Sequence, residues 1–392
     1  MYRKAAIVGI GQTDISANSG RSEWELALEA ILAALADAGL EAREIDGIVR
    51  YAYDSVTEPM LARSLGVRNL RWYGEIGYGG IATCGVVAQA AAAIAAGQAS
   101  VVVVYRSLNE RSGVRFGRAE RHVPLRGDGV SLAEGLKSPG GAFTAPYGLL
   151  APGQVIAMQT HRYQHLHGLS DEDLVRTLGA IAVQQRAYAR TNPAAMMRDR
   201  PMTLDDYRAS RMISTPLRLF DYCLESDGAA ALVLVDAERA QALRRDPVYV
   251  LSASQSMPPY SEPVPTYVHD ITVLGAAGTA QRLFADARIT PADLAAAELY
   301  DAFTILVLLQ LEDYGLTSKG EGWRYLLDQG FGLDSRLPIN THGGHLSEGY
   351  LHGMNHFTEA VRQLRGTAAN QIGGDGPILV GAVGMSSAIL GR

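Results

Sequence analysis

Cysteine and lysine are scarce in this sequence, and the shortage excludes several classes of protein. The 392 residues include two cysteines, Cys84 and Cys223, too few for a disulfide framework or a four-cysteine zinc site. The only lysines are Lys4 at the start of the first strand, Lys137 in a loop and Lys319 in the polar stretch "TSKGEG", and none lies in a motif that we assign to the chemistry. A Schiff-base aldolase needs a desolvated lysine, so the sequence argues against that class of enzyme.

Excess positive charge and long apolar runs are missing as well. The net charge of −6 argues against a nucleic-acid surface and against a polybasic membrane anchor. No apolar run approaches the length of about 18 residues that a membrane-spanning helix needs. The N-terminal stretch "MYRKAAIVGIGQT" has neither the apolar core nor the cleavage site of a signal peptide. We therefore expect a soluble, cytoplasmic protein.

Two distant parts of the chain share one pattern. Residues 34–54 and 283–303 each contain a helix end, a short turn, an acidic helix start, an apolar strand and a Tyr-Asp pair. A glycine-rich turn, a helix and an apolar strand then follow in both 77–107 and 343–387. The strand "SVVVVY" in the first copy is typical of a strand buried on both faces. The repeat predicts two related halves rich in βαβ units.

The boundaries of these halves follow from the pattern. A chain of 392 residues exceeds what one compact core usually holds. We place an N-terminal half at residues 1–240 and a C-terminal half at residues 245–392. Residues 112–215 differ in composition, being rich in arginine and glycine and then helical, and we interpret them as a loop domain inserted in the first half.

Specific motifs support a family resemblance that covers essentially the whole chain. The stretches "DYCLESDGAAALVLV" and "NTHGG", in this duplicated layout, resemble the thiolase superfamily and above all its sterol-carrier-protein-type thiolases. The resemblance implies an α/β thiolase-like fold, with duplicated α-β-α-β-α layered halves and an inserted loop domain.

The residues that thiolases use for catalysis are replaced here. The nucleophilic cysteine position of the family falls on Ile81, or on Gly80 one residue earlier, and Cys84 lies one helical turn further on. We expect Cys84 to be a small buried helix residue. The stretch "ILVGAVGMSS" holds no second catalytic cysteine. Tyrosines occupy both histidine positions, Tyr300 in "YDAF" and Tyr350 in "SEGYLHG".

This combination, with "NERSGVRFG", "SRLPINTHGGHLSEGYLHGMN" and "VRQLRGT", resembles the steroid side-chain-cleaving aldolases, formerly called lipid-transfer proteins. The resemblance implies retro-aldol cleavage of a β-hydroxyacyl-CoA side chain, giving a 17-keto steroid and propionyl-CoA. It implies a CoA thioester as substrate and no further cofactor. It also implies a homodimer that assembles with the OB-fold and zinc-ribbon domain of a partner acyl-CoA hydratase subunit, as a heterotetramer.

Tyrosine suits a retro-aldol step because the proton to be removed belongs to an alcohol. A tyrosinate, with a reference pKa of about 10, is a stronger base than a neutral imidazole, at about 6.5. We assign Tyr350 as the base and Tyr300 as its partner and proton carrier, and the reverse order stays open. We expect Asp301 to orient Tyr300, and His352 to hydrogen-bond the reacting pair. Glycines in "GYGGIAT" and "GAVGMSS" are expected to offer backbone donors to the enolate oxygen.

Four histidines in "INTHGGHLSEGYLHGMNH" raise the alternative of a metal site. A metal-dependent aldolase would use such a site to hold the enolate. Glu348 is the only nearby carboxylate in the sequence, and His342 and His345 flank two glycines. We therefore expect no metal, and we expect His356 to be an ordinary helix-face residue.

The sequence gives weaker evidence about CoA or NAD binding than about the tyrosine pair. Arg111, Arg115 and Arg118, together with Arg121, could meet the phosphates of CoA, although a solvated basic loop or a dimer surface would have the same composition. The stretch "VGIGQT" is an incomplete dinucleotide fingerprint, so we assign no NAD.

Two other functions stay open at this point. The chain could be a non-catalytic acyl-CoA or sterol-binding subunit with a thiolase fold, or an acyl-CoA thiolase in which Cys84 serves as the nucleophile. Tyrosine at both histidine positions favours the aldolase over these alternatives.

Overall fold

The computed structural model describes residues 2–77, 80, 83–113, 115, 145–149, 151–243, 246–255, 270–383 and 386–392. Several predictions fall outside this part of the chain. They concern Ile81, Arg118, Arg121, most of the glycine-rich stretch before the first buried helix, part of "GAVGMSS", and much of the inserted region.

The first half alternates strands and helices. Its elements, in chain order, are β1 (Ala5–Gln12), α1 (Glu23–Ala38), β2 (Gly47–Tyr51), α2 (Glu58–Leu65), β3 (Trp72–Ile76), α3 (Thr83–Ala95), β4 (Val101–Asn109), β7 (Asp227–Asp236) and α9 (Ala237–Ala240). Between β4 and β7 lie α6 (Pro152–His167), α7 (Asp171–Thr191), α8 (Leu204–Ala209), β5 (Met212–Ser214) and β6 (Leu217–Arg218). The inserted region is therefore mainly helical where it is described.

The second half repeats this order. Its elements are β8 (Val248–Gln255), α10 (Ala276–Ala287), β9 (Ala296–Leu299), α11 (Thr304–Asp313), α12 (Gly322–Asp328), α13 (Gly344–Ser347), α14 (Met354–Arg365), β10 (Ile378–Ala382) and β11 (Ser386–Gly391). Short 3-10 helices lie at Ala42–Glu44, Ala145–Tyr147, Leu219–Asp221 and Pro291–Asp293.

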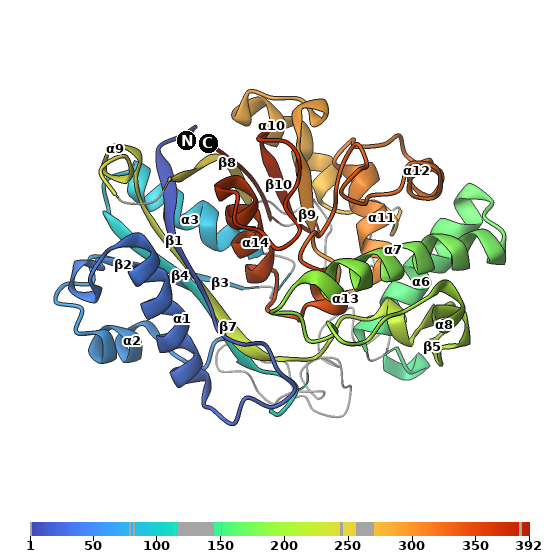
Figure 1. The fold of residues 1–392 in the computed structure, drawn as a ribbon, viewed down its shortest axis with the longest axis horizontal. Helices are drawn as coiled ribbons and strands as arrows, with labels where there is room; N and C mark the ends of the chain where they lie inside the picture. The colour runs from blue at the N-terminus through green and yellow to red at the C-terminus, as the bar shows by residue number, and fades with distance from the viewer. Residues whose placement is uncertain are drawn as a thin grey trace.

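Strand order confirms the predicted duplication. Within the described residues, nine strands form one sheet in the order β3-β2-β4-β7-β1-β8-β11-β10-β9. Reading outward from the junction of β1 with β8, the first half gives β1, β7, β4 and β2, and the second gives β8, β11, β10 and β9. The pairings match as well, since β2–β4 and β9–β10 are parallel while β4–β7 and β10–β11 are antiparallel. The two termini lie close together in Figure 1.

Helices α3 and α14 form the centre of the molecule. Each contacts strands of both halves, whereas α1 packs on β1, β7 and β4, and α10 packs on β8 and β11. The valine run of β4 shows why the sheet is covered on both faces: Val101 and Val103 join the core that contains α1, and Val102 and Val104 join the core that contains α3 and α14. The prediction of a doubly buried strand is confirmed.

Local sequence signals set the ends of these elements. Ser22 caps α1 by accepting a hydrogen bond from the Glu25 backbone N–H, and Gly39 ends the helix in a left-handed conformation. In the inserted region, α7 packs against α11, α12 and α13 (Figure 1). This contact places the insertion beside the histidine-rich segment. Among the described residues, no helix has the length and apolarity required to cross a membrane.

The histidine-rich segment, residues 339–356, is buried and leads from the loop after α12 through α13 into the start of α14. Asn340 anchors its start, since the Leu299 N–H donates to Asn340 Oδ1 at 2.7 Å and Asn340 Nδ2 donates to the Leu299 carbonyl at 2.9 Å. Asn340 and His352 both have positive φ values, 52° and 53°, which residues other than glycine adopt only rarely. The loop therefore returns to the carboxyl end of β9, where Tyr300 begins.

Candidate active site

Tyr300 and Tyr350, which occupy the two histidine positions of the thiolase pattern, meet in the structure although both lie in the C-terminal half of the chain. Their hydroxyl oxygens lie 2.6 Å apart, a hydrogen-bond distance, and their rings stand at 70° to each other. Tyr300 directly follows β9 and Tyr350 lies between α13 and α14. Both side chains are buried, with 4% and 8% of their surface exposed.

Backbone contacts fix both tyrosines. The Tyr300 N–H donates to the Gly381 carbonyl at 3.0 Å, and Gln310 Nε2 donates to the Tyr300 carbonyl at 2.7 Å. Ser226 makes two hydrogen bonds with the backbone of Tyr350. Its Oγ accepts from the Tyr350 N–H at 2.9 Å and donates to the Tyr350 carbonyl at 2.8 Å. The two phenols are therefore held by strands and loops of both halves.

Both phenols are neutral in the resting site. Burial raises the pKa of Tyr300 well above its ordinary value, although the hydrogen bond from Tyr350 lowers it in part. Burial also raises the pKa of Tyr350, and Tyr300, Cys223 and Glu110 raise it further. An ionised tyrosine is therefore disfavoured before substrate binds, whereas the comparison of basicities made from the sequence assumed a tyrosinate.

Gly80 explains how Tyr300 fits. A Cβ atom at position 80 would lie 2.0 Å from the Tyr300 hydroxyl oxygen and 2.5 Å from Cζ. Any side chain at position 80 would collide with the phenol of Tyr300. Glycine at this position therefore makes room for the tyrosine.

Neither cysteine has the environment of a nucleophile. Cys84 is fully buried, its thiol donates to the Val380 carbonyl at 3.3 Å, and burial raises its pKa, so the prediction of a structural residue is confirmed. Cys223 is partly buried and lies near enough to the tyrosines to influence both pKa values. Burial raises the pKa of the Cys223 thiol well above its ordinary value, which keeps it protonated.

Asp301 organises the turn beside the tyrosines. Its Oδ1 accepts from the His345 N–H at 3.0 Å and lies 3.1 Å from His345 Nδ1 and 3.2 Å from His356 Nε2. Burial acts to raise the pKa of Asp301, but His345 and His356 outweigh it and lower the pKa to about 2. Asp301 is thus an anion that holds His345. The His345 ring in turn stands edge-on to Tyr300 and Tyr350, with centroids 4.9 and 5.0 Å away.

The prediction that His356 is an ordinary helix-face residue is wrong. The side chain is fully buried at the start of α14, where its Nδ1 lies 3.2 Å from His342 Nε2. His342 Nδ1 lies 3.1 Å from Glu298 Oε2. Burial opposes a charge on His342, but Glu348 and Glu298 raise its pKa to about 10. Polar contacts therefore run from Asp301, beside the tyrosine pair, through His356 and His342 to Glu298.

The argument against a metal was also wrong in its premise. Glu348 is not the only carboxylate near the histidines, because β9 brings Glu298 and Asp301 to the same place from some forty residues away. Two trios, Glu298–His342–His356 and Asp301–His345–His356, have nitrogen and oxygen atoms within 4.8 Å of one another. Within the described residues these groups contact one another directly, as in the 3.1 Å contact of His342 Nδ1 with Glu298 and the 3.2 Å contact of His356 Nε2 with Asp301.

His352 approaches the pair from the other side. Its ring stands at 90° to that of Tyr350, with centroids 4.9 Å apart, and its Nδ1 accepts a hydrogen bond from Arg106 Nε at 2.9 Å. Arg106 is itself paired with Asp54 at 2.7 Å. The structure thus places His352 beside Tyr350, and its hydrogen bond to the reacting pair stays a prediction. Arg106 and Asp54 were not predicted at this site.

Two of the arginines expected to bind CoA are described, and both have a protein partner. Arg111 and Arg115 both form ion pairs with Glu225, the first at 3.3 Å. Arg118 is outside the described residues. Phosphate binding by these arginines stays a prediction.

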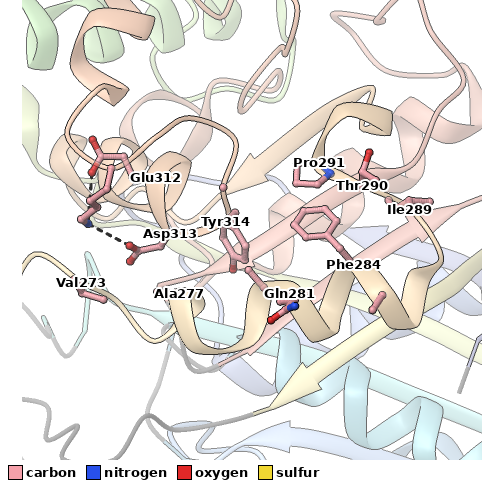
Figure 2. Close-up of a pocket in the computed structure, with 14 residues that line it drawn as sticks. Val273, Ala277, Gln281, Phe284, Ile289, Thr290, Pro291, Glu312, Asp313 and Tyr314 are labelled. Carbon is pink, nitrogen blue, oxygen red and sulfur yellow. Dashed lines mark hydrogen bonds and ion pairs between the residues drawn. The ribbon is translucent and has the colours of Figure 1, made fainter.

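A surface cavity of about 610 Å³ lies elsewhere, between α10 and the end of α11. Figure 2 shows Phe284 and Gln281 of α10 on one side and Tyr314 on the other. Lys319 lines this cavity, 3.2 Å from Asp313 and 3.4 Å from Glu312. This ion-paired lysine is not placed for Schiff-base chemistry at the tyrosines.

Comparisons with known proteins agree with this geometry. A family model described as Thiolase C-terminal domain-like matches residues 262–387. The chain is 46% identical to the steroid side-chain-cleaving aldolase of Thermomonospora curvata, over 99% of this chain and 97% of the relative. The chain belongs to the steroid side-chain-cleaving aldolases of the thiolase superfamily. Its identity to the 17-hydroxy-3-oxo-4-pregnene-20-carboxyl-CoA lyase of Mycobacterium tuberculosis is 43%, over 99% of both chains.

The solved structure of the Ltp2-ChsH2(DUF35) aldolase superposes on this family member with a TM-score of 0.90. The two are 43% identical, and the match covers 100% of this chain and 98% of that one. The predicted thiolase-like fold is confirmed.

Sequence reasoning missed several residues around the tyrosine pair of this aldolase. The sequence suggests His345 only as an alternative metal ligand, and Gly80 only as a nucleophile position or a backbone donor. Arg106 sits in an apolar strand, "VVVVYRS", where a charged residue that becomes fully buried is unusual. This unusual position is the one feature of the sequence that points to a role for Arg106.

Proposed function

We propose that this chain catalyses retro-aldol cleavage of a steroid whose side chain is a β-hydroxyacyl-CoA thioester. The compound named for the M. tuberculosis relative, 17-hydroxy-3-oxo-4-pregnene-20-carboxyl-CoA, has this form. Breaking its C17–C20 bond leaves a ketone at C17 and releases propionyl-CoA. The observation that carries the proposal is the 2.6 Å contact between the hydroxyls of Tyr300 and Tyr350.

The reaction moves one proton from oxygen to carbon. The C17 hydroxyl loses its proton and becomes the ketone oxygen. The electron pair of the C17–C20 bond passes to the thioester as an enolate, and a proton added at C20 completes propionyl-CoA. One proton is removed and one is added, so the step needs no oxidant, reductant or co-reactant. We propose no cofactor beyond the CoA thioester of the substrate.

Two hydrogen-bonded neutral phenols suit this exchange. In our proposal Tyr350 accepts the hydroxyl proton while its own proton crosses to Tyr300, and Tyr300 gives its proton to C20. The reverse order is chemically equivalent. Neither phenol has to ionise before substrate binds, which agrees with the raised pKa of both. Groups of this kind contribute about 10²–10⁴-fold to a rate.

Asp301 and His352 support the pair in different ways. Asp301 acts through His345, whose ring packs against both phenols. His352 lies beside Tyr350 and is proposed to contact substrate. We propose that Arg111, Arg115 and Arg118 contribute to CoA binding, with a substrate phosphate replacing Glu225 as the partner of the first two.

Assembly and location are also proposals. The similar Ltp2 structure is a complex with ChsH2(DUF35), and we propose a DUF35 partner of the same kind, with an OB-fold and zinc ribbon, for this chain. Strand β3 lies at one end of the described sheet and exposes Tyr73. An open strand edge is a surface through which two copies can pair, so we propose a homodimer in a heterotetramer. We propose a cytoplasmic location.

Product analysis tests the function. The purified chain, with and without a DUF35 partner, is incubated with 17-hydroxy-3-oxo-4-pregnene-20-carboxyl-CoA. We expect equal amounts of the 17-keto steroid and propionyl-CoA. Tight substrate binding without product, with partner present, would instead favour a non-catalytic binding subunit.

A further inference from the structure

His352 is held in an unfavourable backbone conformation by contacts from two elements. Its φ of 53° lies in the left-handed region. Thr83 Oγ1, at the start of α3, donates to the His352 carbonyl, and Arg106 of β4 donates through Nε to Nδ1 at 2.9 Å. A conformation of this kind persists only where the surroundings over-determine it, and such sites concentrate where function requires them.

The Asp54–Arg106 ion pair is the second unusual feature. Its side chains are 0% and 1% exposed, and the Asp54 oxygen lies 2.7 Å from Arg106 Nη1. Asp54 also accepts from the backbone N–H groups of Tyr51 at 2.9 Å and Ser107 at 3.0 Å. A buried ion pair adds little stability compared with apolar residues of the same size. The ion pair with Asp54 instead orients the Arg106 side chain so that its Nε–H donates to His352.

That contact decides where the imidazole carries its proton. A guanidinium in a protein does not deprotonate and offers no acceptor, so His352 Nδ1 must be the acceptor and cannot hold a hydrogen. The proton of the neutral ring is then on Nε2, at the opposite edge from Arg106. Burial, Arg106 and His345 lower the pKa of His352 well below its usual value. Within the part of the chain that the structure describes, the titratable and charged groups around the ring include Tyr51, Tyr53, Asp54, Arg106, His345 and Tyr350.

We propose that Asp54 and Arg106 are positioning residues that keep His352 neutral with its proton on Nε2, as a fixed donor to the enolate oxygen. This inference rests on the proposed function. The His352 ring stands edge-on to Tyr350, 4.9 Å between centroids, so the donor belongs to the same site as the phenols. When the C17–C20 bond breaks, negative charge collects on the thioester oxygen. A preoriented neutral N–H stabilises that charge in a buried site and keeps its proton, so protonation occurs at C20 through the tyrosines.

Nitrogen NMR of the free protein tests the tautomer without any substrate. Histidine is labelled with ¹⁵N, and the His352→Gln variant identifies the His352 signals among the nine histidines. We expect Nδ1 unprotonated and Nε2 protonated, unchanged from about pH 5 to about pH 8, where a free imidazole titrates. In Arg106→Lys, which keeps the charge and loses the Nε–H, we expect mixed tautomers. A wild-type signal with Nδ1 protonated, or one that titrates near about 6.5, would overturn the proposal.

A mutant cycle tests whether Asp54 and Arg106 affect the reaction through His352. The double variant Asp54→Leu, Arg106→Met removes both charges together and so avoids leaving one of them buried alone. In the wild-type background we expect kcat to fall about 10-fold or more through loss of orientation, with KM changed less. In a His352→Ala background we expect the same double substitution to have no further effect on kcat. An equal fall in both backgrounds would show that the pair does not act through His352.

The conservative variant His352→Gln provides the matched control. A glutamine amide offers an N–H near the position of Nε2, so we expect it to retain more activity than His352→Ala. The NMR result stands whether or not cleavage of the steroid is observed. Failure of the wild-type protein to form product would therefore count against the proposed function, and a wrong tautomer would count against this inference alone.

Discussion

The Tyr300 hydroxyl fills the space that a side chain at Gly80 would need. A Cβ atom at position 80 would lie 2.0 Å from the Tyr300 hydroxyl oxygen. Gly80, three residues before α3, thus leaves the space in which the Tyr300 phenol reaches Tyr350. A side chain at position 80 and the observed position of Tyr300 exclude each other for a steric reason.

The Gly80→Ala variant should therefore displace Tyr300 and disrupt the phenol pair. A shift of about 1 Å in a reacting group can cost about 100-fold in rate, and we expect a loss of at least that size in kcat. Gly77→Ala is the matched control, since nothing lies within 4 Å of a Cβ at that position. Equal activity of the two variants would show that Tyr300 does not need this space.

The pH dependence of kcat distinguishes a neutral pair from a resting tyrosinate. Burial raises the pKa of Tyr300 and of Tyr350 well above the ordinary value, so both stay protonated through neutral pH. We expect kcat to be flat from about pH 6 to about pH 9, and to change only as a phenol ionises at higher pH. A tenfold rise per pH unit across this range would mean that the ionised form is the base.

Both thiols should be dispensable. Cys84 donates to the Val380 carbonyl in the core, and burial keeps Cys84 and Cys223 protonated by raising their pKa values. We expect Cys84→Ala and Cys223→Ala to keep kcat within about threefold, since neither residue exchanges a proton or forms a bond with substrate. Thiol alkylation followed by mass spectrometry should find neither residue acylated after turnover. Loss of cleavage in Cys84→Ala alone would support the thiolase alternative.

Asp301 should contribute to stability in a pH-dependent way. Its pKa is about 2, against an ordinary 3.8, so its ionised form stabilises the folded state by about 2 kcal/mol at neutral pH. That contribution is complete above about pH 4 and is lost as pH falls through about 2. We expect Asp301→Asn to lower the free energy of unfolding at neutral pH, and the difference from wild type to narrow at acid pH.

Urea unfolding of both proteins at several pH values measures this difference. Asp199→Asn is the control, because the Asp199 side chain is 92% exposed and should leave the free energy of unfolding unchanged. A gap between Asp301→Asn and wild type that stays constant down to about pH 2 would contradict an ionised Asp301.

The fold could be predicted from the sequence because its signals are local and occur twice. The valine run of β4 indicated a strand buried on both faces, and the matching patterns at 34–54 and 283–303 became α1–β2 and α10–β9. The tyrosine pair could be found because Tyr300 and Tyr350 stand at the two histidine positions of the thiolase pattern. These features depend on spacing along the chain, which the sequence displays directly.

The surroundings of the phenols could not be predicted in the same way. Glu298 precedes His342 by more than forty residues, and they meet only because Asn340 ties the loop back to β9. Arg106 reaches His352 across the interface of the two halves. Contacts of this kind depend on how the halves pack, and no local spacing encodes them.

Single-turnover cleavage by the tyrosine variants tests the central claim most directly. Tyr300→Phe and Tyr350→Phe remove one hydroxyl each, and Tyr314→Phe is the matched control, because its buried hydroxyl makes a 2.6 Å contact with Ser387 away from the pair. With partner and steroid acyl-CoA in rapid-quench experiments, we expect the C–C cleavage rate to fall by about 100-fold or more in each of the first two and to stay near wild type in the third. Cleavage at the wild-type rate in either Tyr300→Phe or Tyr350→Phe would contradict the account.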